Sequence, residues 1–197
     1  MKMIGLCGGS GAGKGEVCRL FKKHGIPSVD TDALSRLVMQ KGHECYTETV
    51  QAFGNEILDD KGEIIRKKLA AIIYRDNDKK RLLEAITHKH IITATLEKIA
   101  EFEKAGFEYA IIDAPLLFES TMNKMCHKTI AVISDEENRI RRIMARDNIT
   151  REFAISRIRV QMSAEELEKR CDYVIYNNYD LDELENAVGK TADEIKI

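Results

Sequence analysis

The sequence predicts an α/β fold, in which a parallel sheet has helices on both faces and a helical block is inserted between two strands. Three observations support this prediction. Short apolar segments recur along the chain with helical segments between them, a pattern typical of parallel sheets buried on both faces. A glycine-rich segment directly follows the first apolar segment. Between residues 33 and 105 helical periodicity continues with no convincing strand pattern.

The first strand is expected at residues 3–7, a short apolar run. Residues 8–15 read Gly-Gly-Ser-Gly-Ala-Gly-Lys-Gly and match the phosphate-binding pattern G-x-x-x-x-G-K-[ST] except at the last position. Helical spacing then continues to about Lys23. A strand, a glycine-rich loop and a helix in this order place free N–H groups and the helix dipole at a phosphate. We therefore expect this loop to bind a nucleoside triphosphate.

Backbone N–H groups of such a loop surround the phosphates, and its lysine reaches the terminal ones. The candidate nucleotide ligands are Gly9, Ser10, Gly11, Ala12, Gly13, Lys14, Gly15 and Glu16. The hydroxyl that usually holds Mg²⁺ is missing, because Gly15 stands in its place. A dinucleotide-binding G-x-G-x-x-G does not fit, since its third glycine would fall at Lys14.

A short second strand is expected at residues 26–29, followed by Asp30-Thr31-Asp32. If the strand stays extended, Asp30 and Asp32 point to the same side, toward the phosphate loop. Asp32 can then take a proton from an attacking hydroxyl or help to hold Mg²⁺, directly or through water. Alternatively, Asp32 caps a helix that begins near Ala33. The residues alone leave both interpretations open.

Apolar spacing predicts helices around residues 34–38, 46–53, 69–73 and 82–86, and a long helix over residues 90–104. His88 and His90 follow the fourth of these helices. They lack a third ligand at zinc spacing, so a zinc site is disfavoured. His88 is either a polar contact to the substrate or a packed loop residue.

Strand character returns at residues 109–113, 129–133 and 173–176. Helices are expected up to about residue 146, from Thr150 to about residue 162, after a capping box at Ser163 and Glu166, and from Asp180 onward. Ligands of parallel sheets bind beyond the carboxyl ends of the strands. Residues 8–15, 30–32 and 113–119 are therefore expected to share one cleft. Residues 115–119 line a substrate pocket there or belong to the core.

Arg139, Arg142 and Arg146 share one helix face by three- and four-residue spacing. A mobile lid that carries arginines stabilises the charge on a transferring phosphoryl group. For any single arginine the alternative is a solvated helix, because acidic residues are interleaved with them. The same interleaving disfavours a nucleic-acid surface.

Composition excludes several classes of protein. The 197 residues are 44% hydrophobic and 32% charged with a net charge of −2, as in a globular protein without a basic surface for nucleic acid. Apolar runs are too short to span a membrane. The five cysteines form no C-x-x-C pair, and no signal peptide is recognised. We therefore expect reduced thiols and a cytoplasmic location.

With these features in order, the chain resembles the dephospho-coenzyme A kinase family over about residues 3–178. The resemblance rests on the phosphate loop and on motifs that occur in the family's order. These motifs are Asp30-Thr31-Asp32 with Arg36, Phe53-Gly54, residues 66–69, Leu83-Glu84-Ala85-Ile86-Thr87-His88, Pro115-Leu116-Leu117-Phe118-Glu119, Arg146-Asp147, Arg157, Gln161 and Asn177-Asn178. It implies a P-loop NTPase three-layer fold with a parallel sheet, a helical substrate-binding insertion and a lid. The core would comprise about residues 1–32, 106–137 and 171–197, the helical region 33–105 and the lid 138–170.

The resemblance also implies transfer of the γ-phosphoryl group of ATP, with Mg²⁺, to the ribose 3′-hydroxyl of dephospho-coenzyme A. Lys14, Arg142 and Asp32 would be catalytic, with Asp32 as the general base and a Mg²⁺ ligand, directly or through water. Arg142 and Arg146 would contact ATP. The residues near the acceptor would be Asp32, Arg36, His88, Leu116 and Leu117. No nucleic-acid or membrane partner is expected, and the protein would be a monomer or a small homo-oligomer.

The chain departs from the family at two positions. Gly15-Glu16 replaces the usual Ser-Thr, and Lys89 replaces a proline. We expect Asp32 with water, or Glu16, to compensate for the missing Mg²⁺ ligand. Two other functions are weighed against this one: a degenerate protein that binds ATP without turnover, and another small-molecule kinase such as a shikimate-type or nucleoside monophosphate kinase.

Overall fold

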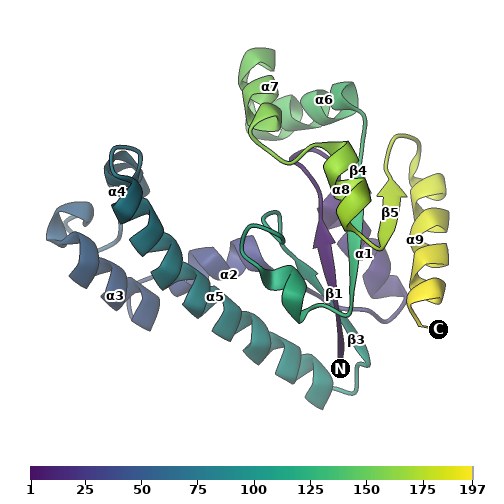
Figure 1. Cartoon of the computed structure of the whole chain (residues 1–197), viewed down its shortest axis with the longest axis horizontal. Helices are drawn as coiled ribbons and strands as arrows, with labels where there is room; N and C mark the ends of the chain where they lie inside the picture. Colours follow the sequence, from purple (N-terminus) through teal and green to yellow (C-terminus); the bar gives the residue numbers. More distant parts are fainter. Residues whose placement is uncertain (197) are drawn as a thin grey trace. The chain divides into compact units, whose positions relative to one another are not determined.

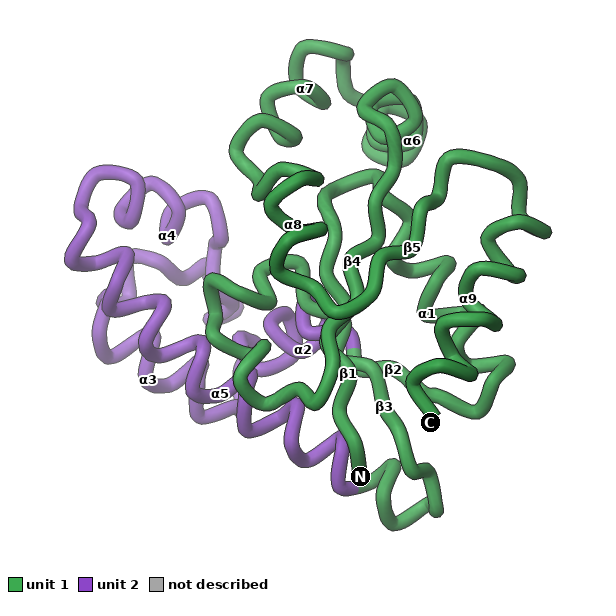
Figure 2. The backbone as a smooth tube through the Cα atoms, turned by 45° about the vertical axis from the view of Figure 1, so that its right-hand side comes forward, with its two compact units in different colours: residues 1–29, 101–197 green, residues 30–100 purple. Residues whose placement is uncertain are grey.

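The computed structural model describes residues 1–196 and divides them into two compact units. One unit comprises Met1–Val29 together with the chain from Glu101 onward, and the other comprises Asp30–Ala100. Figure 2 colours the two units separately. Within residues 1–196, no helix combines the length and the apolar character that a membrane span needs.

A five-stranded sheet with the order β2-β3-β1-β4-β5 forms the centre of the first unit, as far as residues 1–196 show. The strands are β1 (Lys2–Cys7), β2 (Ser28–Asp30), β3 (Tyr109–Asp113), β4 (Lys128–Ile133) and β5 (Tyr173–Tyr176). β1 pairs in parallel with β3 on one side and β4 on the other, and β4 pairs in parallel with β5. Because β1 is central, the phosphate loop at its carboxyl end lies in the middle of that edge, where parallel sheets bind ligands.

Helices α1 (Lys14–Lys23) and α9 (Leu181–Ile195) pack together against one face of this sheet (Figure 1). Apolar side chains at helical spacing explain the packing, since Leu20, Phe21 and Val188 are fully buried in one cluster with strand residues. On the other face, Leu117 packs so closely that a Cβ at Gly5 would lie 2.7 Å from its Cδ2 atom. The short helices η2 (Met122–Met125) and α8 (Ala164–Arg170) contact β1 and β4 respectively. The predicted three-layer fold is confirmed.

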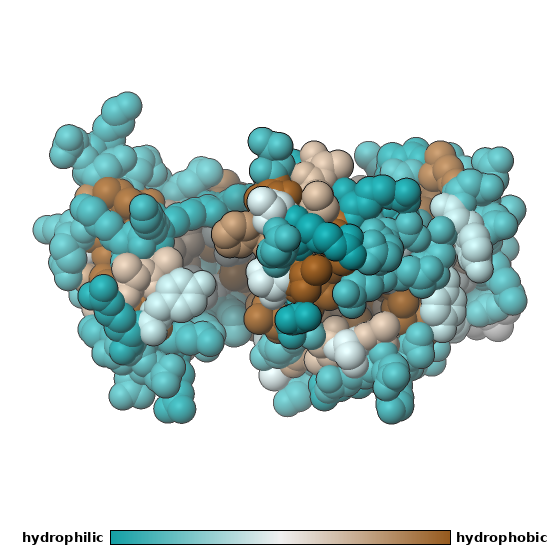
Figure 3. Space-filling model, turned by 90° about the horizontal axis from the view of Figure 1, so that it is seen from above, coloured by the Kyte–Doolittle hydropathy of each residue, from teal (hydrophilic) through white to brown (hydrophobic). Residues whose placement is uncertain are grey.

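Two helices follow β4 and share a small apolar core. They are α6 (Glu136–Asp147) and α7 (Arg151–Arg159), and they bury Ile140, Ile143, Ala154 and Ile158. α7 ends before the predicted residue 162, and Thr150 holds its N-cap position without a side-chain cap. Ser163 caps α8 as predicted, since its hydroxyl accepts a hydrogen bond from the Glu166 N–H at 3.2 Å. Figure 3 shows the molecule from above, the side where α6 and α7 lie in Figure 1. This surface is mostly hydrophilic, with small apolar patches.

The second unit is helical, as its periodicity predicts. It contains α2 (Thr31–Val38), α3 (Glu44–Phe53), the 3-10 helix η1 (Asn55–Ile57), α4 (Arg66–Ile73) and most of α5 (Asn77–Lys104). Phe53, Ile57 and Leu69 form its buried core. The prediction of two helices separated near His88 is wrong, because α5 is continuous. No glycine or proline interrupts residues 77–104, and the Thr87 hydroxyl bonds back to the Leu83 carbonyl within the helix at 2.8 Å.

The segment after β2 also differs from the prediction. β2 ends at Asp30, and α2 begins at the next residue. Asp30 is the N-cap, because its side chain accepts a hydrogen bond from the Ala33 N–H at 2.9 Å. Asp32 therefore lies in the first helical turn, and neither the extended pairing of Asp30 with Asp32 nor a capping role for Asp32 holds.

Candidate active site

The phosphate loop joins β1 to α1 through a backbone that favours glycine. Gly13 precedes α1 with φ 97°, a left-handed conformation that L side chains rarely adopt. Its carbonyl accepts hydrogen bonds from Glu16 N and Val17 N, which start the helix. A Cβ at Gly13 would collide with Nδ2 of Asn177. The loop therefore presents the N-terminus of α1 at the carboxyl edge of the sheet, as an anion site requires.

Lys14 and Asp113 meet at this edge. The Nζ atom of Lys14 lies 3.8 Å from Oδ1 of Asp113, and the two side chains are 14% and 15% exposed. Asp113 ends β3, the strand beside β1, and its Oδ2 accepts a weak hydrogen bond from Cys18 Sγ at 3.7 Å. In this position, the lysine is suited to bind phosphate, and the carboxylate is suited to bind a hydrated cation. The sequence placed Asp113 in the same cleft as the phosphate loop but gave it no role, although an acid at the end of a strand was the available signal.

Two arginines of α6 reach the carbonyl groups of the loop. Arg139 donates from Nε to the Ser10 carbonyl at 2.9 Å. Arg142 donates to the Gly11 carbonyl at 3.2 Å and to the Ser134 hydroxyl at 3.1 Å. Desolvation by burial lowers the pKa of both guanidinium groups from the ordinary arginine value. The N-terminal half of α6 is thereby fastened onto the phosphate loop.

The third predicted arginine lies elsewhere. Arg146 is 61% exposed and donates to Asp147 at 2.8 and 2.9 Å. Arg157 also pairs with Asp147. The structure therefore brings Arg142 to the loop and leaves Arg146 in a surface ion pair. Arg139, for which the sequence predicted only a place on the shared helix face, is the second arginine that contacts the loop.

Gln161 adds a further contact with the loop, from the segment between α7 and α8. Its Oε1 accepts hydrogen bonds from the Ser10 N–H at 2.9 Å and from Arg139 Nη2 at 3.0 Å. Its Nε2 donates to the Ser10 hydroxyl at 3.0 Å. Sequence reasoning counted Gln161 only among the motifs of the resemblance. One side chain between α7 and α8 thus engages both the backbone and the side chain of Ser10.

Asn177 and Asn178 fasten the end of β5 to the same region. Asn177 Nδ2 donates to the Ala12 carbonyl at 2.8 Å. Asn178 exchanges two hydrogen bonds with Asp135 at the start of α6, at 2.7 and 3.0 Å. The Asn-Asn pair of the sequence therefore connects β5, the phosphate loop and α6.

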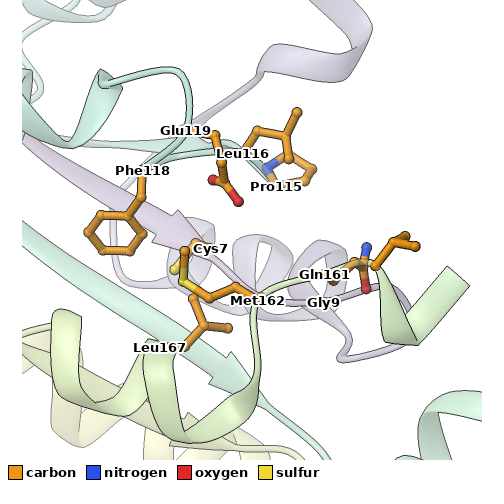
Figure 4. A pocket seen from close by; sticks show the side chains of 11 residues that line it. Cys7, Gly9, Pro115, Leu116, Phe118, Glu119, Gln161, Met162 and Leu167 are labelled. Carbon is orange, nitrogen blue, oxygen red and sulfur yellow. The ribbon is translucent and has the colours of Figure 1, made fainter. Parts of the chain in front are cut away.

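A pocket of about 240 Å³ opens beside the loop (Figure 4). Side chains from the segment after β3 face those from the segment before α8 across it. The lining residues are Cys7, Gly8, Gly9, Pro115, Leu116, Phe118, Glu119, Val160, Gln161, Met162 and Leu167. Leu116 is 58% exposed, whereas Leu117 is fully buried. The structure therefore assigns Leu117 to the core, because its side chain packs under Gly5.

Three predicted acceptor residues belong to the second unit. Asp32 is exposed on α2, and His88 lies partly buried in α5. Arg36 lines a pocket of about 470 Å³ within this unit. The pocket is lined by Ser35, Arg36, Met39, Gln40, Glu63, Ile64, Arg66, Leu83, Glu84 and Thr87. A site shared by these residues and the phosphate loop stays a prediction.

The residues near Gly15 bear on how Mg²⁺ would be held. Glu16, one of the two expected substitutes, accepts hydrogen bonds from Arg19 Nε at 3.0 Å, and Arg19 lowers the pKa of its carboxyl group. Among residues 1–196, no group of three or more His, Cys, Asp or Glu side chains is arranged to hold a metal. Mg²⁺ on a nucleotide needs only one or two carboxylates, since phosphates and water supply its other ligands. Asp113, next to Lys14, fits that requirement.

The model of a protein family described as dephospho-CoA kinase matches residues 2–183. The chain belongs to the dephospho-CoA kinase family. A dephospho-CoA kinase of Listeria monocytogenes is 38% identical over 187 residues, which cover 95% of this chain and 94% of that protein.

Solved structures support the same fold. A Thermus thermophilus protein superposes with a TM-score of 0.85 at 30% identity and covers 98% of this chain and 97% of its own. A shikimate kinase of Bacteroides thetaiotaomicron has a TM-score of 0.52 at 16% identity, covering 100% of this chain and 99% of its own. The second likeness concerns the fold alone. Membership of the dephospho-CoA kinase family therefore favours that family's reaction over that of a shikimate-type kinase.

Proposed function

We propose that the chain is an active dephospho-CoA kinase that transfers the γ-phosphoryl group of ATP to the ribose 3′-hydroxyl of dephospho-CoA. The products are ADP and CoA. The observation that carries this proposal is the Lys14–Asp113 pair at the phosphate loop, 3.8 Å apart and largely shielded from solvent, in a chain that matches the family over residues 2–183.

The residues of the first unit would act on the nucleotide. Lys14 would neutralise charge on the terminal phosphates, and the N–H groups at the start of α1 would bind the others. Asp113 would hold Mg²⁺ through water in place of the hydroxyl missing at Gly15. Mg²⁺, when bound, supplies charge stabilisation on the phosphoryl oxygens. Arg139 and Arg142 would shift from loop carbonyls to phosphate oxygens when the lid closes over ATP.

The residues of the second unit would act on the acceptor. Asp32 would accept the proton of the 3′-hydroxyl as its oxygen attacks the γ-phosphorus. Arg36 and Arg66 line the same pocket, and their guanidinium groups would bind the diphosphate of dephospho-CoA. His88 remains a candidate for a polar contact with the acceptor. In the first unit, the exposed Leu116 would supply apolar contact surface.

The test is an ADP-release assay with Mg-ATP and one acceptor at a time: dephospho-CoA, AMP or shikimate. We expect ADP only with dephospho-CoA, together with formation of CoA. Binding of ATP without ADP release from any acceptor would instead establish the degenerate function, which the glycine at position 15 favours. An Asp32→Asn variant should lose at least about 10²-fold in turnover if Asp32 is the base. Full activity in that variant would remove Asp32 from this role.

The cytoplasmic location and the state as a monomer or small homo-oligomer also stay proposals. The location rests on the scattered, unpaired cysteines in the sequence. Size-exclusion chromatography with light scattering would measure the oligomeric state directly.

A further inference from the structure

Two cysteines that are far apart in the sequence meet next to the phosphate loop. Cys7 ends β1, directly before Gly8, and is fully buried. Cys171 follows the last residue of α8 and is partly exposed. Their Sγ atoms are 3.5 Å apart, and both thiols are free. Neither residue has a part in the proposed phosphoryl transfer beyond the place of Cys7 in the wall of the pocket.

The surroundings hold the two sulfur atoms in this arrangement. Cys7 Sγ also contacts the Ile130 carbonyl at 3.6 Å. Asp172, the neighbour of Cys171, accepts hydrogen bonds from the N–H and the hydroxyl of Thr129, both at 2.8 Å. Both cysteines are thereby held next to β4. A disulfide bond needs the sulfur atoms at about 2.05 Å, so the two thiols must move closer together to form it. Cys171 lies just past the end of α8 in an extended conformation.

The two thiols differ in reactivity in a way that suits a redox pair. The hydrogen bond from Cys7 lowers the pKa of the Cys171 thiol. The same contact, together with burial, raises the pKa of Cys7. A partly exposed thiol with a lowered pKa is the first to be oxidised, and a neighbouring thiol then resolves the product.

We propose that Cys7 and Cys171 form a reversible disulfide when a hydroperoxide reaches the protein, and that this bond stops the kinase cycle. The Cys171 thiolate attacks one peroxide oxygen, the O–O bond breaks, and water leaves when hydrogen peroxide is the oxidant. The resulting sulfenic acid is attacked by the Cys7 sulfur, and a second water leaves as the S–S bond forms. Two thiols thereby lose two electrons in total, and one hydrogen peroxide becomes two water molecules.

The position of the bond explains its effect. It would tie the end of α8 to the residue that precedes the phosphate loop. The segment before α8 carries Gln161, which already bonds to Ser10 in the loop. With α8 tied to β1, this segment would be held on the loop, and the lid could not open to admit or release nucleotide. This effect on turnover rests on the proposed function, whereas formation of the disulfide does not.

The first experiment detects the bond itself in the full chain. The protein is treated with a small molar excess of hydrogen peroxide, alkylated, digested with trypsin without reduction, and analysed by mass spectrometry. Each of the tryptic peptides 3–14 and 171–190 contains a single cysteine. We expect them to appear joined, two hydrogen masses lighter than their sum, and to separate after dithiothreitol. Recovery of both peptides unjoined at peroxide levels that oxidise Cys171 would overturn the proposal.

The second experiment measures turnover and nucleotide binding before and after peroxide. Wild type should lose at least about tenfold in turnover and regain it with dithiothreitol. The Cys171→Ser variant should keep its activity through the same treatment. Cys126→Ser is the matched control, because Cys126 bonds only locally to the Met122 carbonyl, and it should respond as wild type does. Equal inactivation of Cys171→Ser and wild type would refute the regulatory effect, and a chain inactive before peroxide would refute the proposed function instead.

Discussion

The side chain of Gln161 accepts a hydrogen bond from the Ser10 N–H at 2.9 Å and donates one to the Ser10 hydroxyl at 3.0 Å. A residue between α7 and α8 thereby occupies an N–H group of the phosphate loop. Arg139 strengthens the contact, since it donates both to Gln161 and to the Ser10 carbonyl. The helices α6 and α7 bury their own apolar side chains between them, and α6 contacts the loop through polar groups such as Arg139 and Arg142.

Removal of the Gln161 side chain should destabilise the protein. In Gln161→Ala, the Ser10 N–H and Arg139 Nη2 lose their shared acceptor, and the free energy of unfolding should fall by about 1–3 kcal/mol. Urea denaturation without nucleotide measures this loss. Gln161→Glu keeps an acceptor for both donors and should lose less. An equal loss in the two variants would show that the acceptor atom is unimportant.

Replacement of the loop lysine should abolish most of the activity without unfolding the protein. Lys14→Ala removes the charge that neutralises the terminal phosphates, so turnover should fall by about 10²-fold or more. Steady-state ADP release measures the change. Lys23→Ala is the control on the same helix, because Lys23 forms only a surface ion pair with Glu185, a type of contact worth little. Comparable losses in both variants would contradict the role of Lys14.

A hydroxyl restored after Lys14 should reduce the demand for Mg²⁺. A Cβ built at Gly15 has no heavy atom within 4 Å apart from its chain neighbours and its own helix backbone, so Gly15→Ser should fold normally. Its hydroxyl would add a direct ligand, and the Mg²⁺ concentration for half-maximal rate should fall severalfold. Gly15→Ala adds the same Cβ without the oxygen and should behave as wild type. If the two variants share one Mg²⁺ dependence, the missing hydroxyl has no consequence here.

The ion pairs of Asp147 should be lost only in strong acid. Hydrogen bonds from Arg146, aided by Arg157, lower the pKa of Asp147 from 3.8 to about 2. Because the folded pKa lies below the unfolded one, the pairs contribute fully above about pH 4, and their contribution disappears as the pH falls toward 2.

Carbon-13 NMR of the Asp147 carboxyl group measures this directly. The titration midpoint should lie near 2 in wild type and move upward in Arg146→Ala. Arg141→Ala should leave it unchanged, because Arg141 donates to Asn138 instead. A wild-type midpoint at the ordinary aspartate value would contradict the ion pairs.

The strands and most helices were predictable, because their apolar periodicity is local. The phosphate loop was predictable for the same reason, since Gly13 and Lys14 act at fixed spacing from one strand and one helix. The single helix α5 was predicted as two helices, although residues 77–104 contain no glycine or proline that would end a helix. The N-cap considered from the sequence was Asp32, whereas Asp30 takes that position. Capping depends on where β2 ends, and helix boundaries are the least certain part of a sequence prediction.

The sequence by itself determined the chemistry that this protein can attempt: a phosphate loop with its lysine, acids at the ends of two other strands, arginines on one helix face, and the family to which these belong. Only the tertiary structure decided which of those groups meet. Residue spacing reports neighbours within one element, whereas the contacts of Lys14 with Asp113, Gln161 with Ser10 and Cys7 with Cys171 join residues about 100 or more positions apart. Such contacts follow from strand order and packing, which no local pattern contains.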